Sequence, residues 1–210
     1  MTIFLYAILF AIGSLIGSFC TLAVYRLPLG KDITHERSFC PNCNHKLNFL
    51  DLIPILSYVF LRGKCRYCGK KIRPRYLILE ILAGLIAVLL GVSFDIKPIE
   101  ISKLILLLFS IVYVTGLVII AGIDKEKKQI QKSVLIFNWV VTATYMIYLF
   151  IVEDANINRY AIYLFFMFAL TIVRILDLKQ ERHWAAGLYI CVINIIAIII
   201  HNYILFHYFL

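Results

Sequence analysis

The sequence predicts an all-α polytopic membrane protein with about six transmembrane helices and a small four-cysteine, zinc-ribbon-like loop between the first and second helices. Three observations lead to this fold class. The 210 residues are 62% hydrophobic with a mean hydropathy of +0.91, which is typical of membrane proteins and not of soluble domains. Long apolar runs recur along the chain. One polar stretch, which holds four of the six cysteines, interrupts them.

The apolar runs each approach the ~20 residues that a bilayer core of ~30 Å demands. The first run has no basic N-region and no small-residue cleavage site before Arg26, so we expect an uncleaved helix and not a signal peptide. Gly13 and Gly17 form a GxxxG pair, which favours close helix packing unless the spacing arose by chance. The predicted spans are 2–25, 76–94, 104–123, 134–152, 160–176 and 185–204.

The charges indicate how these spans are oriented. With six spans, 18 of the 21 Lys and Arg residues fall on one side, in segments 26–75, 125–132 and 174–182. The positive-inside rule makes that side cytoplasmic and leaves both termini outside. The net charge of +9 is therefore mostly a topology signal, with some attraction to anionic lipid head groups. No nucleic-acid-binding motif accompanies the basic residues, so we expect a lipid bilayer and no nucleic acid as partner.

Composition divides the chain into a first transmembrane helix (1–25), a cytoplasmic loop (26–75) and a transmembrane bundle (76–210). The loop contains Cys40-Pro-Asn-Cys43 and Cys65-Arg-Tyr-Cys68, separated by 21 residues. Two such knuckles can close a tetrahedral shell of four thiolates, which suits structural Zn²⁺ better than a catalytic metal. Two disulfides or four unrelated thiols are the alternatives, and a reducing cytoplasmic loop favours the metal.

The same stretch carries a family resemblance. Asp51-Leu-Ile-Pro-Ile-Leu-Ser-Tyr58, Leu61-Arg-Gly-Lys-Cys-Arg-Tyr-Cys68, Arg75-Tyr76 and Glu80 follow the upstream blocks Gly17-Ser-Phe19 and Tyr25-Arg-Leu-Pro28. Together they resemble the type IV prepilin peptidases, bacterial membrane aspartyl proteases that also N-methylate their product. The family's proline after Arg-Tyr is Leu77 here, and its asparagine after Gly-Ser-Phe is Thr21.

The resemblance implies location in the bacterial cytoplasmic (inner) membrane and a prepilin or pseudopilin substrate, from a type IV pilus, competence or secretion system. It also implies a structural zinc site at Cys40, Cys43, Cys65 and Cys68, and S-adenosylmethionine as a methyl donor. Glu80 stands where the family has a glutamate. It either acts in the site, orients the loop, or pairs with Arg73 or Arg75 at the interface.

Asp124 lies at the end of the third predicted span, directly after Ile123, and Ile130 follows Asp124 by six residues. This pattern resembles the family's first catalytic aspartate motif, although Gln131 and Lys132 replace its proline and second acid. The alternative is an acid that caps a helix at the membrane interface.

The family's second catalytic acid lies in Gly-x-Gly-Asp followed by x-Lys, and no Gly-x-Gly-Asp exists in this chain. The closest equivalent is Asp177-Leu-Lys179, since the acids at 95, 100, 153 and 154 are predicted on the opposite side of the membrane. Arg174, three residues earlier on the same helical face, could instead form an interfacial ion pair with Asp177.

We therefore expect a membrane aspartyl endopeptidase in which Asp124 and Asp177 share general acid–base hydrolysis. The altered motifs leave two alternatives. One is a catalytically degenerate homologue that binds pilin-like helices, and the other is a member with methyltransferase activity alone. The sequence carries no signal for an oligomeric state.

Overall fold

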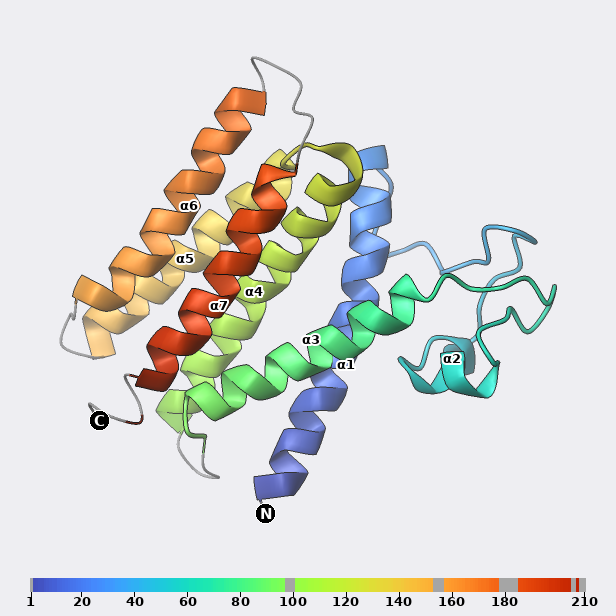
Figure 1. The fold of residues 1–210 in the computed structure, drawn as a ribbon, viewed down its shortest axis with the longest axis horizontal. Coiled ribbons are helices and arrows are strands. Elements are labelled where there is room, and N and C mark those ends of the chain that lie inside the picture. Colours follow the sequence, from blue (N-terminus) through green and yellow to red (C-terminus); the bar gives the residue numbers. More distant parts are fainter. Residues whose placement is uncertain (1, 97–100, 153–156, 178–184, 205–206, 208–210) are drawn as a thin grey trace. The chain divides into compact units, whose positions relative to one another are not determined.

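The computed structural model describes residues 2–96, 101–152, 157–177, 185–204 and 207 (Figure 1). Within these residues the secondary structure is helical, apart from two isolated β-bridges. Three short helical elements, η1 (Leu27–Leu29), η2 (Phe49–Asp51) and α2 (Leu56–Phe60), lie in the loop. The long helices are α1 (Thr2–Arg26), α3 (Arg75–Ser93), α4 (Ile101–Lys127), α5 (Lys132–Val152), α6 (Ile157–Asp177) and α7 (Ala186–Ile204).

Each long helix corresponds to one of the six predicted apolar runs, and α4 continues past the predicted end to Lys127. Among the described residues, α1, α3, α4, α5 and α7 are long and apolar enough to cross a membrane. The predicted all-α, multi-span fold is thus confirmed. The sixth helix, α6, covers the predicted run 160–176 but does not belong to this set of five.

The helix ends follow from local sequence. Four of the five prolines lie among the described residues, and none of these four lies within a long helix, where a proline would remove a backbone hydrogen bond. Pro28 follows α1 in the short turn η1, and Gly30 closes that turn at φ 63° with its N–H donated to the Leu27 carbonyl. Glycine adopts this left-handed conformation without a Cβ clash, so the chain leaves α1 abruptly for the loop.

The chain divides into two compact units, residues 1–88 and 89–210, with the boundary inside α3. In the first unit, α1 and α3 approach closely at the GxxxG pair. A Cβ on Gly13 would lie 2.6 Å from the Ala83 carbonyl oxygen, and one on Gly17 would lie 2.7 Å from the Ala83 Cβ. The predicted close packing at these glycines is confirmed, because no larger residue fits between the two helices.

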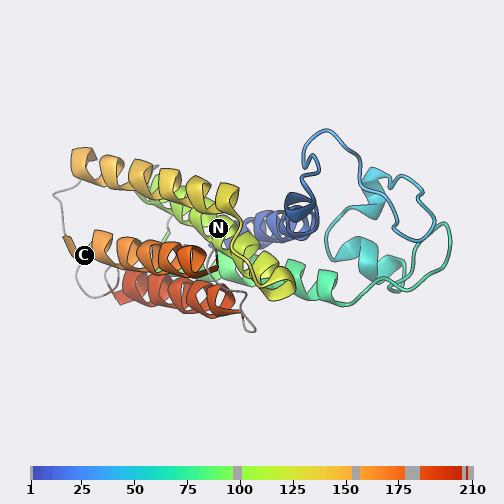
Figure 2. The same cartoon turned by 90° about the horizontal axis from the view of Figure 1, so that it is seen from above.

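In the second unit, α4, α5, α6 and α7 form a four-helix bundle (Figure 2). Helix α4 packs against α5 and α7, while α6 packs against the same two helices. Over half of the α4 span is buried (56%), against 28–39% for the other four candidate spans. Leu117 and Ile120 of α4 are fully buried in this unit, as are Met167 and Leu170 of α6. Any chemistry at the C-terminal end of α4 is therefore held by the most enclosed helix.

Candidate functional site

The two CxxC segments fold as matching knuckles in the first unit. In the first, the Cys40 N–H donates to the His45 carbonyl (3.0 Å) and the Asn44 N–H donates to the Cys40 carbonyl (2.8 Å). In the second, the Cys65 N–H donates to the Lys70 carbonyl and the Gly69 N–H donates to the Cys65 carbonyl, both at 2.9 Å. Asn44 and Gly69 follow the second cysteine of each pair and have positive φ values of 54° and 67°. These are residue types that tolerate the left-handed conformation.

The knuckles bring the four cysteines together as predicted. Their Sγ atoms all lie within 4.8 Å of one another, and those of Cys40 and Cys68 are 4.0 Å apart. A tetrahedral zinc site with Zn–S bonds of about 2.3 Å has sulfurs about 3.8 Å apart. The four thiols are free and not disulfide-bonded. The cluster therefore fits one tetrahedral metal ion after shifts of less than an ångström, and it fits the predicted disulfide alternative poorly.

The thiols differ strongly in acidity before any metal binds. Hydrogen bonds from the Lys70 N–H and the Asn42 amide lower the pKa of Cys68 to about 6. The His45 N–H acts the same way on Cys43, but desolvation and the neighbouring sulfurs of Cys40 and Cys68 outweigh it and raise the pKa of Cys43 to about 11. Thiolates this close repel one another, and a bound divalent cation removes that penalty. The donor set thus suits a structural ion with no open coordination position.

Contacts between side chains join one knuckle to the other. The rings of His45 and Tyr67 lie with their centroids 3.6 Å apart. Asp51 of η2, whose side chain is 3% exposed, accepts hydrogen bonds from Arg66 Nε (2.7 Å) and the Tyr67 hydroxyl (3.2 Å). Burial alone would raise the pKa of the Asp51 carboxyl, but the bonds from Arg66, the Asn48 N–H and Tyr67 hold it below its ordinary value.

The loop is also tied to both flanking helices. Arg26, the last residue of α1, is 3% exposed and donates to the carbonyls of Asp32, Glu36 and Arg37 at 2.9–3.2 Å. On α3, Glu80 Oε2 accepts the Ile55 N–H at 2.8 Å. Ile55 has φ 63°, which is strained for a β-branched residue, and the bond to Glu80 holds it. The bond from Ile55 to Glu80 is the contact expected if Glu80 orients the loop, which is one of its predicted roles.

Asp124 lies in the last turn of α4 and is completely buried, with 0% exposure. Its Oδ2 accepts the Leu188 N–H at 3.0 Å. Leu188 is the third residue of α7, so this N–H is one of those that a helix start leaves without an internal partner. A Cβ on Gly187 would lie 3.2 Å from the Asp124 Cγ. Glycine here lets the α7 backbone approach the carboxylate.

Asp177 ends α6, as predicted, and contacts a different backbone group. Its Oδ2 accepts the Ile130 N–H at 3.2 Å, while Arg174 Nη1 donates to the Ile130 carbonyl at 2.8 Å. The last turn of α6 thus binds both the backbone N–H and the backbone carbonyl of Ile130, which lies in the α4–α5 connection. The Ile130 side chain is buried and its Cδ1 would lie 3.3 Å from a Cβ on Gly187. Ile130 therefore lies between the surroundings of Asp177 and those of Asp124.

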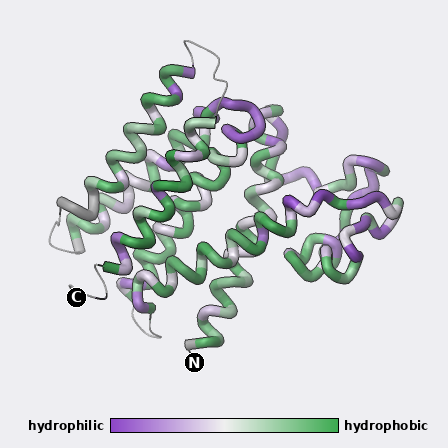
Figure 3. The backbone as a smooth tube through the Cα atoms, in the orientation of Figure 1, coloured by the Kyte–Doolittle hydropathy of each residue, from purple (hydrophilic) through white to green (hydrophobic). Residues whose placement is uncertain are grey.

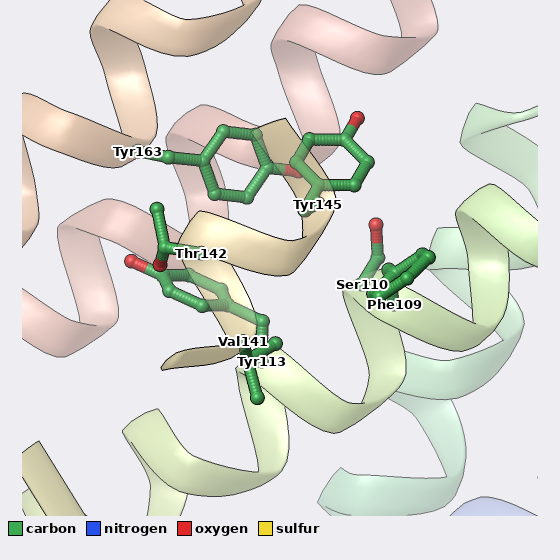
Figure 4. Close-up of a pocket in the computed structure, with 7 residues that line it drawn as sticks. All are labelled: Phe109, Ser110, Tyr113, Val141, Thr142, Tyr145 and Tyr163. Carbon is green, nitrogen blue, oxygen red and sulfur yellow. The ribbon is translucent and has the colours of Figure 1, made fainter. Parts of the chain in front are cut away.

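Sequence reasoning missed a set of polar side chains inside the apolar bundle. The side-chain oxygens of Ser110, Asn138 and Asn194 are buried and accept no hydrogen bond from the described residues. Tyr113, Tyr145 and Tyr163 surround a small cavity beside Ser110 (Figure 4). Its volume of about 10 Å³ leaves room for no more than one water molecule. The only sequence signal was a polar residue within each apolar run, which marks candidate functional positions in membranes.

Comparison with known proteins identifies relatives of the N-terminal part. Residues 11–94 match the family described as the bacterial peptidase A24 N-terminal domain. Proteins named "Prepilin leader peptidase/N-methyltransferase" are similar as well. That of Vibrio cholerae is 44% identical over 93 residues, which cover 40% of this chain and 37% of the relative.

Longer matches reach into the second unit. The Bacillus subtilis protein of the same name is 36% identical over 132 residues, covering 62% of this chain and 50% of the relative. The Klebsiella pneumoniae protein is 32% identical over 152 residues, covering 66% and 63% respectively. The chain thus spans between 37% and 63% of the length of these three curated relatives. No solved structure matches the chain.

Proposed function

The chain belongs to the type IV prepilin peptidase family through residues 11–94, and from this premise we propose that it is a membrane aspartyl endopeptidase. It removes the short leader from a type IV prepilin or pseudopilin. The observation that carries the proposal is the burial of Asp124, an acid with 0% exposure in the last turn of the central helix α4. A carboxylate inside an apolar bundle is costly and marks a functional position.

In the proposed reaction, Asp124 and Asp177 act as general base and general acid. The ionised member takes a proton from water as the water oxygen attacks the scissile carbonyl. The protonated member then donates its proton to the leaving amine, and no covalent intermediate forms. Arg174 donates to the Ile130 carbonyl while Asp177 accepts the Ile130 N–H, so both side chains contact the same residue of the α4–α5 connection. Asp124 is completely buried and accepts the Leu188 N–H, so entry of water and substrate requires the residues around it to move.

The proposed function includes two cofactors, a structural zinc ion and S-adenosylmethionine. Cys40, Cys43, Cys65 and Cys68 would hold structural Zn²⁺, which supplies folding energy to the loop. The relatives' name includes N-methyltransferase, and we extend to this chain the transfer of a methyl group from S-adenosylmethionine to the new N-terminal amine. The loop and both acids would face the cytoplasm across the cytoplasmic membrane, with 18 of the 21 basic residues on that side.

A specific contact favours a second candidate, a degenerate homologue that binds pilin-like helices without cutting them. The backbone that approaches Asp124 is that of Gly187 and Leu188, and neither residue supplies an acid. An aspartyl dyad needs two carboxylates close enough to share a proton. If Asp177 stays on Ile130 in the complex with substrate, Asp124 has no second acid and only caps α7.

Leader removal by purified variants separates the two candidates. The peptidase predicts that Asp124→Asn and Asp177→Asn each abolish cleavage of a prepilin on a gel, whereas Glu126→Gln, an exposed acid two residues from Asp124, cleaves normally. Cleavage that survives Asp177→Asn would remove Asp177 from the dyad. Binding of the prepilin without cleavage would establish the degenerate homologue. Transfer of a labelled methyl group to a pre-cut pilin without peptidase activity would leave the methyltransferase alone.

A further inference from the structure

Two short elements of the loop expose an unusual number of large apolar side chains. Phe49 and Leu50 of η2 are 81% and 63% exposed, and Leu56, Val59 and Phe60 of α2 are 53%, 58% and 80% exposed. We call these five residues the apolar knob. The two elements pack against each other, so the five side chains come from adjoining parts of the loop. Exposed apolar surface of this kind marks an interaction site and not an ordinary solvated loop.

The local structure turns this surface outward. In α2, Leu56, Val59 and Phe60 stand at positions i, i+3 and i+4, which share one helical face. Tyr58 points the other way, because its ring would contact a Cβ on Gly63 at 2.9 Å and its hydroxyl reaches the Ile72 carbonyl at 3.5 Å. In η2 the polar residue is the one that is anchored, since Asp51 binds Arg66.

The loop thus reverses the usual pattern of a soluble domain: polar anchors face inward and apolar side chains face outward. Figure 3 shows hydrophobic colour along α2 in a loop that is hydrophilic over much of the rest of its length. The contacts of Asp51 with Arg66 and of Tyr58 with Ile72 hold the polar sides of η2 and α2 against the rest of the loop. The apolar side chains that this arrangement leaves exposed gain free energy by transfer to a less polar medium.

The position of the loop in the chain indicates that a lipid bilayer is the nearby apolar medium. The loop begins after α1 and ends at α3, both of them candidate membrane spans, and Arg26 and Glu80 tie it to these helices. It therefore stays at a bilayer surface. Segment 26–75 carries eleven Lys and Arg residues against three Asp and Glu. Lys46 precedes η2, while Arg62 and Lys64 follow α2, so cations flank the knob on both sides in sequence.

We propose that the apolar knob docks into the anionic leaflet next to the loop. The five apolar side chains enter the boundary between head groups and acyl chains, and the flanking cations contact lipid phosphates. The lipid surface, together with α1 and α3, then fixes the height of the metal knuckles. This surface is independent of the proposed peptidase chemistry, since it uses none of the residues assigned to that reaction.

Bromolipid quenching tests the docking on the full chain in vesicles of phosphatidylethanolamine and phosphatidylglycerol. Phe60→Trp adds one fluorophore on the knob, and Lys70→Trp adds one at an exposed position of the second knuckle. Subtracting wild-type emission removes Trp139 and Trp184. We expect bromolipid to quench the added emission of Phe60→Trp at least about twofold more than that of Lys70→Trp, with a blue-shifted maximum. Val59→Trp, on the same face, replaces Phe60→Trp if that variant does not elute as a single species.

Four results would overturn the proposal. A knob tryptophan that is quenched by aqueous acrylamide and not by bromolipid is exposed to water. One that is shielded from both is covered by protein. One that changes only when a prepilin is added belongs to a protein-binding surface. Quenching that persists unchanged after phosphatidylcholine replaces phosphatidylglycerol would refute the requirement for anionic lipid.

Discussion

Replacing Cys68 with serine tests the metal cluster, because serine removes one sulfur while preserving the size of the side chain. We expect the purified variant to lose its metal and the loop between residues 38 and 73 to lose its backbone protection. The transmembrane helices should stay folded, since they depend on apolar packing in their own units. Cys20→Ser is the matched control, because Cys20 is buried in α1 outside the cluster.

The expected magnitude follows from the small number of other contacts in the knuckles. Each knuckle is closed by two backbone hydrogen bonds, which contribute only about 1 kcal/mol each. A structural zinc ion supplies about 10–16 kcal/mol of binding energy to such sites. One ligand of four therefore accounts for roughly 3 kcal/mol, which weakens metal binding by a factor on the order of a hundred.

Two measurements check this. Metal content per chain, measured after dialysis against a chelator, should fall from one ion in wild type and Cys20→Ser to a small fraction in Cys68→Ser. Hydrogen exchange should then show fast exchange of the Cys40 and Cys65 N–H groups in Cys68→Ser alone. A variant that retained one tightly bound ion, or equal loss in Cys20→Ser, would refute the four-cysteine site.

Three further predictions concern single contacts. In Gly187→Ala the new Cβ would lie 3.2 Å from the Asp124 Cγ, so the carboxylate must shift by a few tenths of an ångström. We expect roughly tenfold slower leader removal without loss of thermal stability, because alanine also favours the helix; an unchanged rate would contradict the catalytic role of Asp124. Gly13→Leu should lower the free energy of unfolding by about 1–3 kcal/mol, because a Cβ at position 13 would meet the Ala83 carbonyl at 2.6 Å. The control is Ala11→Leu at an exposed position of the same helix. Equal thermal stability of the two variants would refute the close crossing. Asp51→Asn should cost the loop roughly 1.5–3 kcal/mol, measured by hydrogen exchange. The lowered pKa of Asp51 means that this contribution is present in full above about pH 5 and is lost as the pH falls through the folded-state pKa, so a cost that appeared only above neutral pH would contradict it.

The sequence predicted the long helices well because each needs only an apolar run free of proline. The cysteine cluster was predictable for a similar reason. Each CxxC knuckle forms from local hydrogen bonds, such as those of Cys40 with His45 and Asn44, so its spacing in sequence largely determines its geometry. The bounds of α1, α3 and α7 lie within one residue of the predicted spans, whereas α4, α5 and α6 extend up to four residues beyond them, because apolar runs and hydrogen-bonded helices end by different criteria.

Contacts between distant segments could not be read in the same way. Nothing in the sequence places the Leu188 N–H on Asp124, or both Asp177 and Arg174 on Ile130, because these contacts depend on how α4, α6 and α7 pack. The apolar knob shows the same limit. The amino-acid sequence of α2 suits a buried helix as well as an exposed one. Only the contacts of Tyr58 with Ile72 and of Asp51 with Arg66 show which side faces outward.

Mass spectrometry of a prepilin from the same genome, after incubation with the purified chain in lipid vesicles, tests the proposed activity most directly. Wild type should release the leader as a separate peptide and leave a shortened pilin. Asp177→Asn, at equal protein and metal content, should leave the prepilin intact. Leader release by Asp177→Asn at the wild-type rate would contradict the Asp124–Asp177 dyad. A prepilin that binds to wild type and stays uncut would contradict the peptidase itself and leave a family member that holds pilin-like helices without cleaving them.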